Sequence, residues 1–183
     1  QHLFTGIDSG EIKIPKFQRD FVWSKNQTAS LIDSIIKGYP IGTFILWKTR
    51  DELRTIKNIG NIELPDPKKD DFVNFVLDGQ QRITSLYALQ KGAVLSKDGK
   101  EIDYKDICID LSCDPDDSEQ VVFTEPPENA PSISVYRLLN AGITDLMSDF
   151  PDKTTLEKIE RYRSSLTGYY FSTIVISEYP IEI

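Results

Sequence analysis

Histidine is almost absent from this sequence. The single histidine, His2, is the second of 183 residues. The first residues of a chain are poorly ordered unless they are tied down, so we do not expect His2 to organise a site. A Ser–His–Asp hydrolase requires a histidine base, and many zinc sites use several imidazoles. The composition therefore argues against a histidine-dependent nuclease, a Ser–His–Asp hydrolase and a multi-histidine zinc site.

Cysteine is nearly as scarce. Cys108 and Cys113 are the only two cysteines. Their spacing matches neither a zinc knuckle nor a redox C-x-x-C motif. We interpret both as unreactive buried thiols of a cytoplasmic protein.

Long apolar runs are also lacking. No stretch approaches the roughly 20 apolar residues that span a bilayer, and the start, QHLFTGIDSGEIK, lacks the basic and apolar regions of a secretory signal. We therefore predict no membrane partner and a cytoplasmic location. The chain has no initiator methionine and stops within an apolar, alternating stretch, so we expect it to be a fragment of a longer protein.

Acidic residues are in excess, but unevenly. The net charge is −8; residues 1–91 have 13 Lys+Arg against 11 Asp+Glu (+2), and residues 92–183 have 8 against 18 (−10). Tight non-specific DNA binding requires clustered cations that neutralise several phosphates. The charge argues against such binding by the whole chain and leaves room for local phosphate binding in the first half.

The elements that are present indicate a mixed α/β fold. Apolar periodicity and turn residues predict the ranges that follow. We expect strands at 11–14, 43–47, 72–77, 93–95, 107–111 and 169–176, and helices at 24–37, 79–91, 135–141 and 153–162. Ser24 with Gln27, and Asp78 with Gln81, match the capping-box pattern. Residues 48–71 are expected to form a surface excursion, and residues 113–131 an acidic loop with little core.

The most informative segment is Asp78-Gly79-Gln80-Gln81-Arg82, between a predicted strand and a predicted helix. Gly79 allows a sharp turn and close approach of a ligand to the backbone. A helix that begins there directs free N–H groups and a positive dipole end towards an anion such as phosphate. Arg82 adds a fork of donors suited to phosphate oxygens.

Neighbouring side chains extend this hypothesis. Asp78 is suited to hold a divalent cation or to orient water, and Gln80 and Gln81 to position water or read a base edge. Thr84 and Ser85 supply hydroxyl groups near the phosphate. A purely structural interpretation competes with this one: Asp78 is then only an N-cap worth about 1 kcal/mol, Gln81 its partner, and Arg82 a solvated helix residue.

A second polar segment, Ile14–Arg19, is less specific. Gln18 and Arg19 are candidate phosphate ligands, although Arg19 beside Asp20 also fits a surface ion pair. The aromatic residues of this region are more typical of packing anchors than of base-stacking platforms: Phe17, Phe21 and Trp23. A nuclease-like pattern at Asp8, Glu11 and Lys13 is too closely spaced and too common to carry an assignment.

Three blocks, IPKFQRDFVW, LIDSIIKGYPIG and FVLDGQQRITSLYAL, resemble the DGQQR-motif N-terminal domain of GmrSD-type, modification-dependent restriction enzymes of bacterial anti-phage defence. Their order is also similar to that of the ParB/sulfiredoxin-like superfamily. The resemblance covers residues 11–91, and the DGQQR motif followed by I-T-S-L is its most specific part.

The resemblance implies a ParB-like nucleotide-binding core at 1–95 and an acidic extension at 96–183 that completes or flanks it. It further implies that the chain binds a nucleoside triphosphate, with Mg²⁺ and hydrolysis, through the motif at 78–82 and through Gln18 and Arg19 facing it. DNA contact through the full-length protein, and a C-terminal or partner nuclease domain, are implied as well. Two alternatives stay open: a module that binds DNA without catalysis, and a ParB-like nuclease that depends on Asp78.

Overall fold

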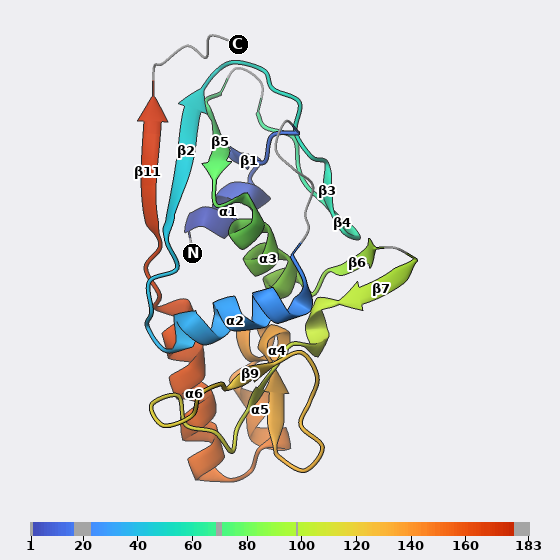
Figure 1. Ribbon diagram of the computed structural model, residues 1–183, viewed down its shortest axis with the longest axis vertical. Coiled ribbons are helices and arrows are strands. Elements are labelled where there is room, and N and C mark those ends of the chain that lie inside the picture. Colours follow the sequence, from blue (N-terminus) through green and yellow to red (C-terminus); the bar gives the residue numbers. More distant parts are fainter. Residues whose placement is uncertain (1, 17–22, 69–70, 98, 178–183) are drawn as a thin grey trace.

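A four-stranded mixed sheet forms one end of the molecule (Figure 1). The computed structural model describes residues 2–16, 23–68, 71–97 and 99–177. The strand order is β1 (Ile12–Lys13), β5 (Val73–Asp78), β2 (Thr43–Thr49) and β11 (Ser172–Ser177). The β1–β5 and β2–β11 pairs are parallel, and the β2–β5 pair is antiparallel. The four strands expected in these regions are confirmed, with small changes in their bounds.

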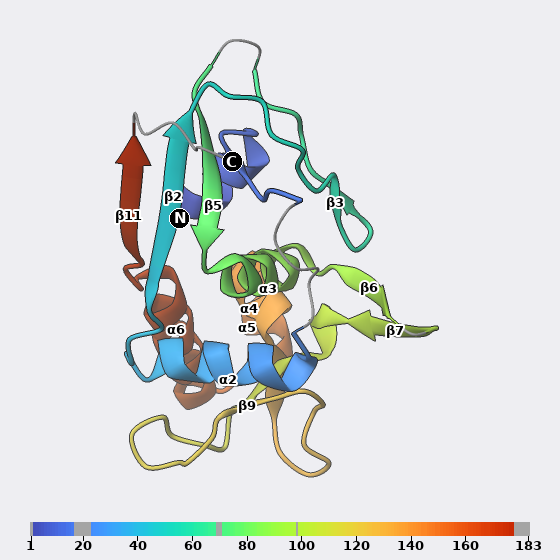
Figure 2. The ribbon, with the colours of Figure 1, turned by 45° about the horizontal axis from the view of Figure 1, so that its top comes forward.

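The first half of the chain also forms three helices: α1 (His2–Asp8), α2 (Lys25–Ile36) and α3 (Gln80–Lys91). Helix α1 was not predicted. Helix α2 begins as expected, because Ser24 and Gln27 form a complete capping box, and its apolar face at 31–36 is buried. Helix α3 is buried around most of its circumference and ends at Gly92, which has a φ of 64°. Figure 2 shows α3 between the sheet and α2.

Two small hairpins extend from this core. β3 (Asn58–Ile59) pairs with β4 (Ile62–Glu63), and β6 (Val94–Lys97) pairs with β7 (Lys100–Asp103), which leads into a short 3-10 turn at Tyr104–Asp106. The strand expected near 93–95 is confirmed, but its partner β7 was not predicted. The 48–71 excursion is more than a surface loop, because Ile59 and Leu64 are buried in the main core.

The other end of the molecule contains a three-stranded sheet and three helices (Figure 1). The strands are β8 (Cys108–Asp110), β9 (Val122–Phe123) and β10 (Ser132–Ser134), and the helices are α4 (Val135–Asn140), α5 (Ile143–Asp149) and α6 (Lys153–Thr167). The expected helices near 135–141 and 153–162 are confirmed. Helix α5 was not predicted.

The expectation that residues 113–131 contribute little core is wrong at β9. Val121 and Val122 are fully buried. Their backbone N–H groups donate to Oδ1 of the buried Asp33 on α2, at 2.7 and 3.2 Å. A carboxylate from the first half of the chain therefore holds two valines of the acidic half in the core, a long-range contact that local composition does not reveal.

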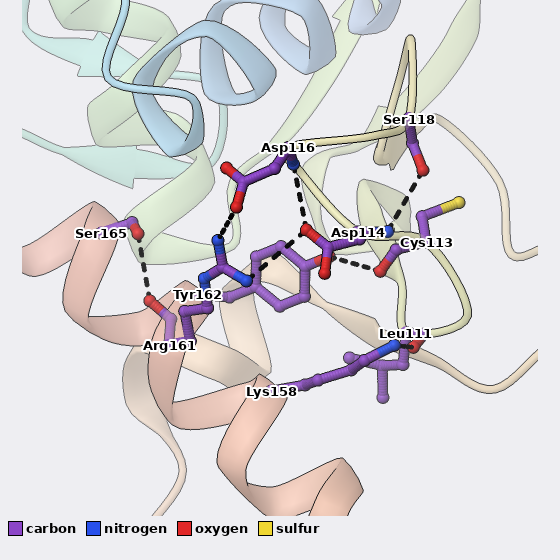
Figure 3. A network of polar contacts seen from close by, with 9 residues as sticks. All are labelled: Leu111, Cys113, Asp114, Asp116, Ser118, Lys158, Arg161, Tyr162 and Ser165. Atoms are coloured by element: carbon purple, nitrogen blue, oxygen red, sulfur yellow. Dashed lines mark hydrogen bonds and ion pairs between the residues drawn. The ribbon is translucent and has the colours of Figure 1, made fainter.

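Helix α6 fixes the acidic loop that follows β8 (Figure 3). Nζ of Lys158 donates to the Leu111 carbonyl at 3.0 Å, and the Tyr162 hydroxyl donates to the Cys113 carbonyl at 3.0 Å. Arg161 forms ion pairs with Asp114 at 3.5 Å and Asp116 at 2.6 Å. The acidic residues of this loop are thus partly neutralised within the chain.

The whole is a mixed α/β fold, as predicted. Strand β11, from the acidic half, joins the sheet formed by strands of the first half, which suits an extension that completes the core. The division near residue 95 and the ParB-like assignment stay predictions. Within the described residues, none of the helices combines the length and apolar character that crossing a bilayer requires.

Candidate functional site at the start of helix α3

The predicted site lies where strand β5 ends and helix α3 begins. Gly79 is the N-cap, with a φ of 88°, and its carbonyl accepts the Ile83 N–H at 2.9 Å. A side chain at Gly79 would collide with the Phe44 ring, and the left-handed backbone is itself unfavourable for other residues. Glycine is therefore required here both for its backbone conformation and for its lack of a Cβ.

The start of α3 has no side-chain cap. The expected capping box between Asp78 and Gln81 is wrong, because the N-cap is Gly79 and no side chain accepts a cap hydrogen bond there. The reason is positional: the left-handed turn at Gly79 leaves Asp78 in strand β5, one residue before the cap. The first amides of a helix have no acceptors inside the helix, so this uncapped start retains its partial positive charge.

Asp78 and Arg82 form an ion pair in which the carboxylate is exposed and the arginine is mostly buried. The Asp78 side chain is 63% exposed and lies 3.2 Å from Nη2 of Arg82, whose side chain is only 17% exposed. Arg82 also donates to the carbonyl of Ile41 in the loop before β2 (2.6 Å) and to that of Thr43, the first residue of β2 (3.0 Å). Its guanidinium lies 5.0 Å from the centre of the Phe44 ring. Arg82 is therefore an interior clamp with its charge beside the helix start, unlike the solvated residue of the structural interpretation.

Gln80 and Thr84 carry buried polar atoms that have no partner. Both residues lie on α3, four positions apart, and are 6% and 1% exposed. Neither Oε1 of Gln80 nor Oγ1 of Thr84 has a hydrogen-bond partner in the structure. Such atoms are uncommon in folded proteins and deserve a functional explanation. The unpartnered Gln80 oxygen belongs to the residue that directly follows the cap and is an acceptor that a water molecule could satisfy.

Ser85 uses its hydroxyl within the helix. Ser85 is fully buried and its hydroxyl donates to the Gln81 carbonyl at 2.8 Å, a bond that uses its only proton within the helix. Gln81 is 6% exposed. Gln18 and Arg19 lie outside the residues that the structure describes, so their predicted position opposite the motif stays a prediction.

The loop at residues 38–42 also lies beside the site, although it is outside the sequence motif. Residues 38–42 connect α2 to β2, and two contacts hold them from far along the sequence. Arg82 binds the Ile41 carbonyl, and the Tyr169 hydroxyl donates to the Tyr39 carbonyl at 2.8 Å and accepts from the Ile41 N–H at 3.3 Å. In the sequence, the two glycines that flank Tyr39-Pro40-Ile41 indicate a tight loop at this place. Both glycines have positive φ, 71° at Gly38 and 87° at Gly42.

The two cysteines are not part of this site. Both are free thiols; Cys108 is buried and Cys113 is half-buried. Burial raises the pKa of Cys108 to about 11, with smaller contributions from Asp110 and Asp106. Among the described residues, no group of three or more His, Cys, Asp or Glu side chains is arranged to hold a metal ion. Any Mg²⁺ at Asp78 would therefore take most of its ligands from a bound phosphate and from water.

The comparisons with known proteins identify the family of this chain. The model of the family "GmrSD restriction endonuclease, N-terminal domain" matches residues 1–182, and the chain belongs to this family. The chain is also similar to an uncharacterized protein of Methanocaldococcus jannaschii, MJ0686, with 37% identity over 87 residues. That alignment covers 43% of the chain but only 14% of the relative, so the chain corresponds to a small part of a much longer protein.

Proposed function

We propose that this domain binds and hydrolyses a nucleoside triphosphate, with the phosphates at the start of helix α3. The uncapped helix start beside the exposed Asp78 carboxylate carries this proposal. A helix start of this kind supplies backbone N–H donors and a positive dipole end for an anion. The unpartnered Oε1 of Gln80 supports it further, since a water or ligand donor would satisfy that atom.

Four residues at or near the start of helix α3 have distinct parts in the proposed reaction. Gly79 removes the side chain that would keep a phosphate away from the backbone. Arg82 adds positive charge next to the phosphate while it fixes the loop at 38–42. Gln80 orients the attacking water through its side-chain amide, because an amide is too weak a base to take the proton itself. Thr84 accompanies Gln80 on the same side of the helix.

Asp78 is the residue suited to Mg²⁺. Its carboxylate is exposed at the helix start, and magnesium sites on phosphate ligands commonly use only one or two carboxylates. When bound, Mg²⁺ would neutralise phosphate charge as the terminal phosphoryl group is transferred to water. Asp78 would hold the ion, and its contact with Arg82 would fix the position of the ion relative to the guanidinium group.

The whole protein would act in restriction of foreign DNA. The family supports contact with DNA and with a nuclease domain elsewhere in the protein or on a partner, and such a role fits the cytoplasm. The net charge of −8 argues against tight DNA binding by the chain itself. A DNA-reading module without catalysis would show steeply salt-dependent DNA affinity and no nucleotide binding.

Calorimetric titration of the chain with ATP, GTP, CTP and UTP, each with and without Mg²⁺, tests the proposal. We expect one or more nucleotides to bind, with affinity that Mg²⁺ increases. Asp78→Asn should abolish the Mg²⁺ effect and, in the full-length protein, hydrolysis. Asp71→Asn is the matched control, because Asp71 is an exposed carboxylate before the opposite end of β5. Absence of binding by all four nucleotides, or full hydrolysis by Asp78→Asn, would reject the assignment.

A further inference from the structure

The two edges of the main sheet differ in how they are protected. Edge strand β1 has only two residues, and the residues that directly follow it, 14–16, pair with the segment at 54–56. Ile56 N–H donates to the Ile14 carbonyl at 3.0 Å, Lys16 N–H donates to the Arg54 carbonyl at 2.7 Å, and Pro15 forms a bridge with Thr55. A short strand, a proline and a covering segment are common devices that prevent an edge from pairing with another chain.

The opposite edge, β11, has none of these devices. It pairs with β2 along all of its six residues, from Ser172 beside Thr43 to Ser177 beside Lys48, without a register shift. No strand of the described residues pairs with its other side, and Figures 1 and 2 both show it at the outside of the sheet. The sequence from Ser164 to Ser177 contains no charged residue and no proline.

Each face of β11 carries an exposed apolar residue. Five of its six residues are exposed, and only Ile176 is half-buried. Ile174 and Val175 point to opposite faces because side chains alternate along a strand, and they are 54% and 52% exposed. An unprotected, uncharged edge with an exposed apolar residue on each face is a template for another strand.

We propose that β11 pairs with β11 of a second copy of this chain, in antiparallel orientation about a two-fold axis at Val175. In an antiparallel pair related by an axis perpendicular to the sheet, opposite residues lie on the same face. Centring the pair on Val175 places Val175 opposite its own copy, Ile174 opposite Ile176, and Thr173 opposite Ser177. Apolar residues then meet apolar residues and hydroxyls meet hydroxyls.

Two features of β11, its lack of charge and its self-complementary pattern, favour a second copy as the occupant. Two chains of net charge −8 repel each other, so close contact requires a segment that adds no like-charge pair of its own. The uncharged strand satisfies this condition, and its pattern of serine, threonine and β-branched residues is self-complementary when centred on Val175. The dimer would have one continuous sheet of eight strands, twice the four of one chain.

Sedimentation equilibrium of the chain across micromolar to millimolar concentrations is the first test. We expect a reversible monomer–dimer equilibrium. Val175→Lys should abolish the dimer, because the two substituted side chains face each other and like charges directly opposite destabilise strand pairing. Met147→Lys is the matched control, since Met147 is equally exposed (55%) but lies on helix α5, and it should dimerise normally.

Charge complementation separates pairing at Val175 from a general loss of structure. Val175→Lys and Val175→Glu should each be monomeric, and their equimolar mixture should form a heterodimer. Val175→Cys should form an intermolecular disulfide under mild oxidation, because directly opposite Cβ atoms are about 4.5–5.5 Å apart. A monomeric wild-type chain at all concentrations, or dimers that survive Val175→Lys, would overturn the proposal.

Discussion

The Nη1 group of Arg82 donates a hydrogen bond of 2.6 Å to the backbone carbonyl of Ile41. This bond connects the first turn of helix α3 to the loop that leads into β2, across 41 positions of sequence. A second bond, from Nη2 to the Thr43 carbonyl at 3.0 Å, makes the contact bidentate. The arginine of the motif therefore shapes the site before any ligand is bound, and its removal would affect stability as well as binding.

Substitution of Arg82 by lysine should destabilise the domain although the charge is kept. An ammonium group cannot reproduce the planar fork that reaches two carbonyls at once. We expect a loss of about 1–3 kcal/mol in the free energy of unfolding, since buried acceptors lose their donors, measured by urea denaturation. Arg50→Lys is the control, because Arg50 is exposed and lies over the Phe72 ring at 4.4 Å. Equal stability of wild type and Arg82→Lys would contradict the clamp.

Gly42 is the position where the loop depends most on a missing side chain. An added Cβ would begin 2.5 Å from Nη1 of Arg82, on a backbone with a φ of +87°. Gly42→Ala should therefore displace the guanidinium and also strain the backbone. The matched control is Gly38→Ala, whose φ is +71° but whose Cβ would meet nothing within 4 Å.

Comparison of the two alanine variants separates backbone strain from collision. Gly38→Ala should cost about 1 kcal/mol, the usual penalty for a left-handed alanine, and Gly42→Ala at least about 1 kcal/mol more. Thermal unfolding measures the difference. Nucleotide titration of the folded variants should show weaker binding for Gly42→Ala only. Identical stabilities would mean that Arg82 moves aside without loss.

Local signals in the sequence were sufficient for most elements near the site. The capping box at Ser24, the glycines at 38 and 92, and the change from strand to helix periodicity at Gly79 are all determined by nearby residues. The helix at 143–149 and the β6–β7 pairing lacked signals of that strength. Short elements gain most of their stability from tertiary packing, which a single sequence does not display.

The polar chemistry of the site was less predictable than its backbone. The motif indicated a charged site at residues 78–82, and the structure adds an ion pair between Asp78 and Arg82. The motif could not reveal that Arg82 faces inward to the carbonyls of Ile41 and Thr43. Every residue has a backbone carbonyl, so the residue types at 41 and 43 do not mark them as acceptors. For the same reason the Asp33 contact with β9 could not be anticipated. Hydrogen bonds between a side chain and a backbone group far away in the sequence cannot be predicted from the spacing of residues in a local motif.

Removal of the Asp33 carboxylate should detach the acidic half from helix α2. Asp33 accepts from the Val121 and Val122 N–H groups and forms an ion pair with Lys37 at 2.7 Å. Asp33→Ala leaves two buried backbone donors without an acceptor and removes the charge partner of Lys37, whose Nζ, among the described residues, keeps only the Glu119 carbonyl. We therefore expect a loss of about 3–5 kcal/mol. Lys37→Met should cost less, because the carboxylate keeps its two backbone donors.

Hydrogen exchange locates the effect of Asp33→Ala. The amides of Val121 and Val122 should exchange much faster in Asp33→Ala than in the wild type. In Lys37→Met the same two amides should stay protected. Protected β9 amides in Asp33→Ala would show that apolar packing alone holds this strand.

Alkaline conditions should weaken the fold through its buried tyrosines. Burial raises the pKa of Tyr162 to about 12, and its side chain is almost fully inaccessible. An unfolded phenol has a pKa of about 10. Between these two values the unfolded chain has released the proton and the folded chain still holds it, so the free energy of unfolding falls as the pH rises from about 10 to 12.

Tyr162→Phe should flatten this part of the stability curve. Phenylalanine cannot ionise, so one contribution to the alkaline loss disappears, and the contribution of Tyr104, whose pKa burial also raises to about 12, stays. At neutral pH the variant should be less stable by about 1 kcal/mol, because the hydrogen bond to the Cys113 carbonyl is lost. Tyr170→Phe is the control, since Tyr170 is 95% exposed. Urea unfolding at a series of pH values measures both effects, and parallel curves for wild type and Tyr162→Phe above pH 10 would contradict the assignment.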